Sequence, residues 1–235
     1  MKHLIASLLL VAACNTDPLA PGAGSKPGGG TNTLLVNGSA SAEPREGIVH
    51  ATRPEDFETE FHIRVTLNGN QVRTGTVEIA QQELVTPLAW TDNDGGMWVG
   101  RAAGYAEVYA LDVISGADEV GGVIVDGPDF HIFTAPLLGA TLDSTVPNAV
   151  EWKRDDVADR ASFRVTGIDR IEIVDNELYS MAPNTMEASS SEVRDAFIEL
   201  RRTNSIVPAG AIPGSDFSVS VENDLQVLVQ PNPAL

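Results

Sequence analysis

From residue 34 onward, apolar side chains recur at alternate positions, and this period of two limits the fold more than any other feature of the chain. Over Phe61–Leu67 the odd-numbered residues are apolar and the even-numbered ones polar, as a strand with one buried face requires. Asn68-Gly69 follows, a dipeptide typical of hairpin turns. Turn residues recur about every 8–14 positions, which favours antiparallel sandwiches or a barrel over a parallel sheet. Further strands are predicted at Val77–Ile79, Tyr105–Ile114, Val120–Val125, His131–Thr134, Val150–Trp152, Phe163–Val165, Ile171–Ile173, Phe217–Val221 and Leu225–Val229, with a turn at Glu222–Asp224 between the last two.

One segment near residue 190 departs from this period and predicts a helix. Val193, Phe197 and Leu200 recur at the i, i+4 and i+7 spacing of a helix face. One of the serines in Ser189–Ser191 can cap its start, and Arg201-Arg202 at its end favours the helix dipole. We therefore predict an all-β chain of two Ig-like antiparallel sandwiches in tandem, with one short helix in the second.

The N-terminus has the features of a secretory signal. A basic start precedes the apolar run Leu4–Val11, which is too short to span a membrane. Val11-Ala12-Ala13-Cys14 contains the single cysteine of the chain and resembles the lipobox of bacterial lipoproteins. That resemblance implies removal of residues 1–13, attachment of palmitate-type acyl chains at Cys14, and anchoring in the cell envelope. Asn15, in place of the aspartate that retains such proteins at the inner membrane, favours the outer membrane. The alternative is a plain signal peptide with an incidental cysteine.

Residues 14–33 predict a tether. They hold three prolines and several glycines, including Gly28-Gly29-Gly30, and few bulky apolar side chains, so they lack the surface needed to form a core. As a flexible coil this segment would span about 25 Å and lift the folded part clear of the membrane.

The remaining chain is divided into a first sandwich at 34–138 and a second at 139–235, with the boundary near Ala135–Gly139. The first resembles carboxypeptidase-regulatory-like or transthyretin-like domains, on the segments Val65–Gly69, Thr76–Ile79, Thr91–Gly95 and Tyr109–Val113. This resemblance implies an Ig-like sandwich that is seldom catalytic. The second, with its early Trp152 and its turn at Pro208–Gly210, is similar to fibronectin type III-like domains.

Charge and cysteine content exclude several classes of function. Acidic residues outnumber basic ones 33 to 15, giving a net charge of -18, so nucleic-acid binding through a basic face is excluded. A single cysteine excludes an internal disulfide and any multi-thiolate metal site. An acidic surface also repels anionic headgroups, which fits a body held off the membrane.

Calcium is the metal that the acidic loops suggest. Asp92 and Asp94 stand around a glycine turn, and Asp126 and Asp129 form a second acidic loop. The EF-hand pattern fails, however, because Ala103 occupies the place of its bidentate glutamate. Since aspartate and glycine also suit a hairpin turn, we predict that the fold does not require calcium.

Catalytic and glycan-binding motifs are weak. His50, His62 and His131 do not form a zincin pair, and no Gly-x-Ser-x-Gly elbow occurs, although a pair of glycosidase carboxylates stays open. Trp90 and Trp98 flank one turn and are candidates for a surface aromatic patch that binds sugar rings, whereas tryptophans in sandwiches more often fill the core.

The sequence therefore predicts a non-catalytic, lipid-anchored cell-envelope protein that serves as an interaction or spacer module and needs no cofactor. Its expected partners are the membrane, through Cys14, and another envelope protein or a glycan. The alternative is a carbohydrate-binding surface lipoprotein.

Overall fold

The computed structural model describes residues 19–20, 22–82 and 84–234, so the predicted signal peptide and Cys14 lie outside the described residues. Within the described residues the chain is all-β, as predicted, and its two helices are short 3-10 turns at Pro54–Asp56 and Asn93–Gly95. None of the described helices has the length and apolar character needed to cross a membrane. The strands are β1 (Lys26–Gly30), β2 (Leu34–Pro44), β3 (Phe57–Leu67), β4 (Asn70–Gln71), β5 (Thr76–Gln81), β6 (Leu84–Pro87), β7 (Ala89–Thr91), β8 (Met97–Ala103), β9 (Val108–Ser115), β10 (Asp118–Asp126), β11 (Ile132–Ala135), β12 (Thr141–Leu142), β13 (Asn148–Lys153), β14 (Arg160–Val165), β15 (Ile171–Ile173), β16 (Leu178–Met181), β17 (Arg194–Ile206) and β18 (Asp216–Val229).

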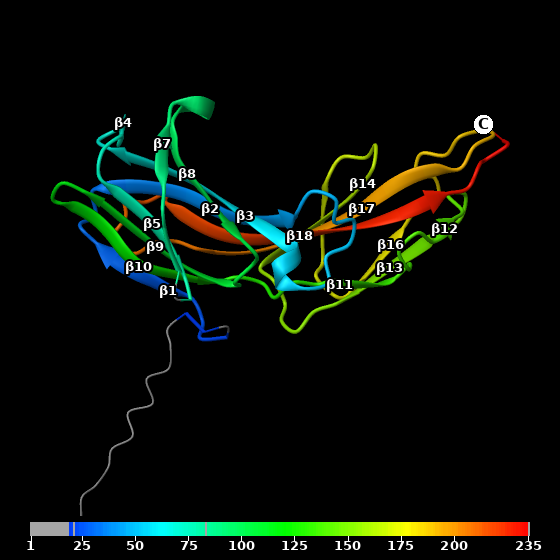
Figure 1. Ribbon diagram of the computed structural model, residues 1–235, viewed down its shortest axis with the longest axis horizontal. Coiled ribbons are helices and arrows are strands. Elements are labelled where there is room, and N and C mark those ends of the chain that lie inside the picture. Colours follow the sequence, from blue (N-terminus) through cyan, green and yellow to red (C-terminus); the bar gives the residue numbers. More distant parts are fainter. Residues whose placement is uncertain (1–18, 21, 83, 235) are drawn as a thin grey trace, which may run out of the picture.

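The described strands form three sheets (Figure 1). Sheet A has the order β1-β10-β9-β5-β6, and sheet C has the order β11-β13-β16. Sheet B is the largest, with the order β15-β14-β17-β18-β2-β3-β8-β7. In addition, β12 pairs with β18 and β4 pairs with β3. The strand pairs of the described residues are antiparallel except β18 with β2 and β18 with β12, which are parallel. Sheet B is therefore common to both halves of the molecule.

Two long strands form the spine of sheet B. β17 and β18 pair from Arg194 opposite Val229 to Ile206 opposite Phe217. At about 3.3 Å per residue, the 14 residues of β18 extend for roughly 45 Å. Figure 1 shows this pair running through both halves of the elongated molecule.

The spine contributes to two separate cores. Phe217, Val219 and Val221 pack in a first core between sheets A and B, with Ile79 and Leu111 of sheet A among its members. The core-facing residues of β18 beyond Asn223 pack in a second core between sheets B and C, which also holds Trp152, Phe163 and Met181; these β18 residues are Leu225, Val227 and Val229. Because all six core residues of β18 have odd numbers, sheets A and C cover the same face of sheet B. The even-numbered residues point to the opposite face.

The predicted helix after Ser189–Ser191 is wrong, because residues 194–206 form β17. This strand pairs with β14 on one side and β18 on the other, so tertiary pairing decides its conformation. Its even-numbered residues Ala196, Ile198 and Leu200 face the second core, whereas Val193 is 53% exposed. A period of two was therefore present beside the helical spacing.

The predicted turn at Glu222–Asp224 is also wrong, because β18 continues through it without a break. Asn223 has the odd number of a core-facing residue and is fully buried. Its side chain binds the backbone of Ala51 through both a donor and an acceptor, at 2.9 Å each, and donates to the His131 carbonyl at 2.9 Å. A polar residue that would suit a turn thus links the spine to two loops.

The domain arrangement departs from the expected division at residue 138/139. The chain does leave the first core near this position, since β11 and β13 already belong to the second half. The N-terminal half of β18, however, returns to the first core through Phe217–Val221 and pairs in parallel with β2. The C-terminal strand is therefore part of both halves.

The predicted tether is shorter than expected, because Lys26–Gly30 forms β1 at the edge of sheet A. A Cβ on Gly28 would lie 2.4 Å from the Gly121 carbonyl oxygen, and one on Gly30 would lie 2.2 Å from that of Glu119. These glycines allow the backbones of β1 and β10 to approach closely, because a larger side chain would clash there. Their flexibility in the unfolded chain does not keep this segment free.

Candidate functional site: the outer face of sheet B

The face of sheet B that points away from both cores carries rows of polar side chains. The strand register sets Thr203, Ser220 and Ser41 side by side, and it sets Ser205, Ser218 and Ser39 in the next row. The hydroxyls of Ser220 and Ser41 lie 3.1 Å apart. Because these hydroxyls belong to paired strands, their positions are fixed by the backbone ladder.

Charged side chains border these rows. Arg160 on β14 lies opposite Thr203, and Glu60 on β3 lies opposite Ser41. Beyond Glu60, Arg101 on β8 binds it at 2.7 Å and Glu58 at 3.2 Å. The outer face of sheet B therefore combines a centre of small hydroxyl groups with charged margins in both halves.

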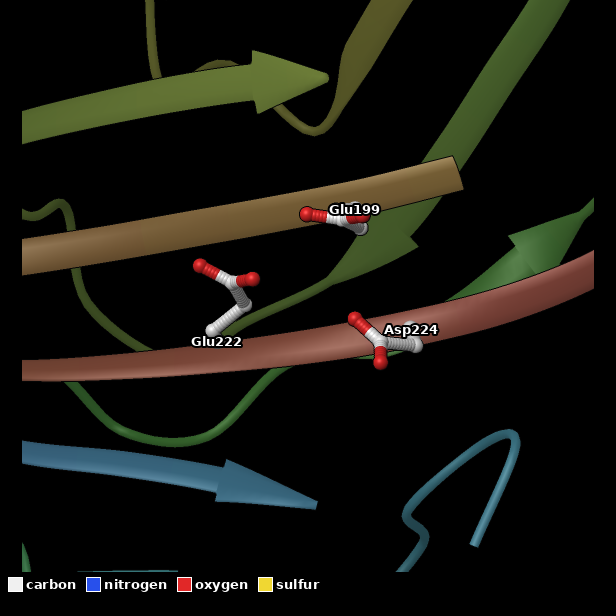
Figure 2. A group of neighbouring side chains, drawn as sticks. All are labelled: Glu199, Glu222 and Asp224. Atoms are coloured by element: carbon white, nitrogen blue, oxygen red, sulfur yellow. The ribbon is translucent and has the colours of Figure 1, made fainter. Parts of the chain in front are cut away.

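A cluster of three carboxylates stands on the same face (Figure 2). Glu199 comes from β17, Glu222 and Asp224 come from β18, and one carboxylate oxygen of each lies within 4.8 Å of the others. Their spacing follows from the register, since Glu199 pairs with Asp224 across the strands and Glu222 is two residues away on the same face.

Three arginines neutralise much of this cluster. Arg164 binds Glu199 through two nitrogens at 2.7 Å each. Arg170 bridges Glu199 and Glu222, at 2.9 Å to each. Arg201 binds Glu222 at 2.6 Å and reaches Glu43 on β2 at 2.8 Å. Glu199 and Glu222 are thus ion-paired, and they hold β14, β17, β18 and β2 together on this face.

Asp224 is the member that titrates near neutral pH. Burial, first, and then the charges of Glu222, Glu199 and Glu43 raise its pKa to about 7, against an opposing effect of Arg164. Within the described structure its Oδ1 atom is buried without a hydrogen-bond partner. Perturbed carboxyls of this kind occur at functional sites and in structural ion networks alike. Chemically, the cluster can exchange a proton near pH 7, and its oxygens are of the type that binds a hard cation.

The face is hollowed at several points. A cavity of about 330 Å³ beside the carboxylate cluster is lined by Arg160, Ser162, Arg170, Glu172, Arg201 and Thr203. A second cavity of about 330 Å³ in the first half is lined by residues that include Ser39, His62, Arg64 and Asp216. Hydrogen-bond donors and acceptors therefore line both cavities, one in each half of the molecule.

The structure does not bring Trp90 and Trp98 together as a surface patch. Trp98 is 6% exposed, belongs to the first core, and donates from Nε1 to the Val72 carbonyl at 3.0 Å. Trp90 packs edge-on against it with ring centroids 5.9 Å apart, and the Arg73 guanidinium lies 5.5 Å from the Trp90 ring centroid. The expectation that Trp98 faces a ligand is therefore corrected, because β8 directs its even-numbered residues to the core. Trp152, at 2% exposed, fills the second core as expected.

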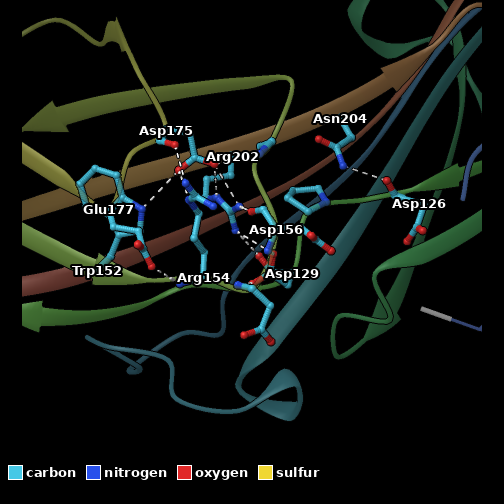
Figure 3. Close-up of polar contacts among 12 residues, drawn as sticks. Asp126, Asp129, Trp152, Arg154, Asp156, Asp175, Glu177, Arg202 and Asn204 are labelled. Carbon is cyan, nitrogen blue, oxygen red and sulfur yellow. Dashed lines mark hydrogen bonds and ion pairs between the residues drawn. The ribbon is translucent and has the colours of Figure 1, made fainter. Parts of the chain in front are cut away.

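The described calcium candidates are engaged in other contacts. Asp92 accepts from Trp90 Nε1 and pairs with Arg73, both at 3.3 Å. Asp126 accepts from the amides of Gly22 and Gly24 at 3.4 and 2.9 Å. Asp129 accepts from the Asp156 amide at 3.1 Å and pairs with Arg202 at 3.3 Å (Figure 3).

The two acidic loops are also far apart. The Asp92 loop precedes β8, whereas Asp126 adjoins Glu107 beyond the opposite end of that strand, as the bond from the Gly127 amide to the Glu107 carbonyl shows. Seven residues of strand separate the two ends by roughly 20 Å. The two loops therefore lie too far apart to supply ligands to one calcium ion.

The sequence reasoning missed a buried polar network between the two cores (Figure 3). Arg202 on β17 is fully buried, and its guanidinium binds Asp175 at 3.0 Å, the Asp129 carbonyl at 2.6 Å, and the Asp156 carbonyl. Asp175 also accepts from Trp152 Nε1 at 3.3 Å and pairs with Arg154 at 3.3 Å. The sequence feature that could have indicated this network is Arg202 itself, a charged residue at an even-numbered, core-facing position of β17.

His131 lies beside this network, whereas His62 lies on β3 in the first half. His131 is fully buried, and its pKa falls well below the ordinary value, first because of burial and then because of the Arg202 and His50 charges, against the backbone of Leu200. The His131 and Phe133 rings meet edge to face with centroids 5.6 Å apart. His62, as expected, is exposed on the polar face of its strand.

Comparisons with known proteins give no assignment. No protein-family model matches the chain, and no curated protein matches it. Fibronectin(III)-like modules of Clostridium thermocellum CbhA match at 12% identity, with a TM-score of 0.25, over 80% of this chain and 92% of that chain. The structure of Dpr11 IG1 bound to DIP-gamma IG+IG2 matches at 12% identity, with a TM-score of 0.24, over 84% of this chain and 98% of that chain. These TM-scores carry no argument, so the all-β class stands on the strands of the chain itself.

Proposed function

We propose that this chain is a non-catalytic cell-envelope protein, anchored by lipid at Cys14, that binds a partner through the outer face of sheet B. The observation that carries the proposal is the continuity of this polar face over both halves, which share β17 and β18. The lipobox resemblance of Val11–Cys14 supports the anchor.

Rigidity makes this face suited to recognition. Its hydroxyl rows and ion pairs belong to strands that are hydrogen-bonded on both sides, so little conformational entropy is lost when a partner binds. Its mixture of arginine, carboxylate and hydroxyl groups matches the polar surface of a protein partner better than an apolar ligand.

Site-specific crosslinking tests the interaction. A photo-crosslinking residue replaces Thr203 in the middle of the face, and a matched control replaces Ile114, which is 49% exposed on sheet A. In native cells we expect a discrete protein adduct from position 203 that is absent from position 114. Equal adduct patterns from the two positions would contradict the assignment of this face.

Fatty-acid labelling tests the anchor separately. Cells grown with a radioactive fatty acid should label the wild-type chain, and the Cys14→Ser variant should lose the label. A variant that retained the full label would exclude lipid attachment at Cys14.

Carbohydrate binding is the alternative, now with the partly buried Trp90 as its remaining aromatic candidate because Trp98 lies in the core. A glycan array probed with the purified chain distinguishes the two proposals. Binding that is lost on Trp90→Ala and kept on Thr203→Ala would favour the glycan over a protein partner on sheet B.

A further inference from the structure

The chain is docked on the folded body almost from its first described residue. Leu19 packs on the outer side of sheet A against Val108, Ala110 and Ile124. The Asp126 carboxylate then accepts from two amides of residues 22–24, and the Asp126 amide donates to the Ser25 hydroxyl at 3.0 Å. From Lys26 onward, β1 is paired with β10. Leu19 and residues 22–25 are therefore docked on sheet A, and β1 is its edge strand.

This docking leaves little chain between the lipid attachment site and the body. Five residue steps separate Cys14 from Leu19, and covalent geometry limits them to about 18 Å at full extension. The described chain begins near β1 on the underside of the first half, and not at either end of the long axis of the molecule (Figure 1). If all of residues 14–33 formed a flexible tether, any face of the molecule could approach the bilayer. The short connection from Cys14 to Leu19 instead favours the approach of one face.

The outer side of sheet A is chemically suited to an uncharged or zwitterionic lipid surface. Val108, Ala110 and Ile124 are buried on this side, with Leu19 packed against them. Farther along the same side, Val85 on β6 and Ile114 on β9 expose apolar side chains, at 52% and 49%. The same side carries the acidic residues Glu78 on β5, Asp112 on β9 and Glu119 on β10. Acidic side chains on this side repel anionic headgroups, so a membrane surface with zwitterionic headgroups suits it better.

We infer that the outer side of sheet A lies against a membrane surface of zwitterionic headgroups, with the polar face of sheet B turned away from it. The inference rests on the proposed lipid anchor at Cys14. It assigns anchoring and partner recognition to opposite sides of the molecule, because sheets A and C cover one face of sheet B and the other is free to meet a partner.

Fluorescence quenching on vesicles tests this orientation. Acylation occupies the native thiol, so the acylated full-length variants Ile114→Cys and His62→Cys each carry one reactive cysteine, on sheet A and sheet B respectively, in the same half of the molecule. Each is labelled with a small fluorophore and reconstituted in phosphatidylcholine–phosphatidylethanolamine vesicles that contain headgroup-nitroxide lipids, which quench at contact range. We expect at least threefold stronger quenching at position 114, and weaker quenching there when anionic phosphatidylglycerol is added.

A lengthened variant is the control. Twenty Gly/Ser residues inserted between Pro18 and Leu19 extend the connection to about 25 residues, with a typical span near 28 Å, and should make the two positions quench alike. Equal quenching without the insertion, or stronger quenching at position 62, would overturn the orientation while the protein still floats with the vesicles. Loss of flotation would instead refute the lipid anchor, and the orientation with it.

Discussion

Replacement of Arg202 by methionine should destabilise the whole molecule, since this guanidinium fills the space between the two cores. The variant leaves the Asp129 and Asp156 carbonyls without their donor and takes one of two arginines from Asp175. Removing one partner of a buried ion pair costs about 3–5 kcal/mol. Because Asp175 keeps Arg154, we expect the lower part of this range, about 3–4 kcal/mol. That is a large part of the roughly 5–15 kcal/mol by which domains are stable.

Urea unfolding followed by tryptophan fluorescence measures this loss. At a slope near 2 kcal/mol per molar, the midpoint should fall by about 1.5–2 M. A Trp152→Phe variant tests the coupling of the two cores, because its remaining tryptophans report the first core. Their unfolding transition should coincide with that of far-UV circular dichroism in the same variant.

Two matched variants make the reasoning refutable. Arg202→Lys keeps the charge but lacks the planar fork that serves three partners, so it should lie between the wild type and Arg202→Met. Arg201→Met removes a neighbouring arginine that is 34% exposed and should cost about 1 kcal/mol or less. If Arg202→Met cost no more than Arg201→Met, the buried network would not be what stabilises the junction.

Three further outcomes follow from the structure. Asp224→Asn should stabilise the fold by about 1–2 kcal/mol at pH 8 and not at pH 4, as thermal melts at both pH values would show. The pKa of Asp224 is about 7 in the folded state and lower in the unfolded state, so the wild type loses stability as the pH rises from the unfolded to the folded pKa. Gly30→Ala places a Cβ 2.2 Å from the Glu119 carbonyl oxygen and should lower the melting temperature and expose residues 19–30 to protease, whereas Gly29→Ala, with no atom within 4 Å, should do neither. Millimolar calcium, compared with chelator, should leave the melting temperature unchanged, and a rise of several degrees that Asp94→Ala abolishes would contradict this.

The all-β class could be predicted from the sequence because apolar and polar residues alternate wherever one face of a strand is buried. Phe57–Leu67 shows the complete pattern, and Asn68-Gly69 forms the predicted turn, with positive φ values of 52° and 79°. The turn at Asp92–Gly96 likewise joins β7 and β8 as expected. Local patterns of this kind depend on neighbours a few residues away, which a single sequence contains.

The errors arose where distant partners decide a local conformation. Val193, Phe197 and Leu200 share a helical spacing, yet pairing with β14 and β18 makes the segment a strand. Asn223 suits a turn by composition, but its buried side chain has partners near residues 51 and 131. The candidate face was missed for the same reason, because Glu199 and Glu222 become neighbours through strand register.

The parity of β18 links these findings to the proposed orientation. In a strand, a shift of one residue exchanges the two faces, so the two cores lie on one side of sheet B only while the odd-numbered positions stay in phase across Asn223. A true turn at Glu222–Asp224 would have freed the second half to place its core on either side. The unbroken strand instead fixes sheets A and C to the same side. A short N-terminal connection on sheet A therefore orients the second core as well as the first.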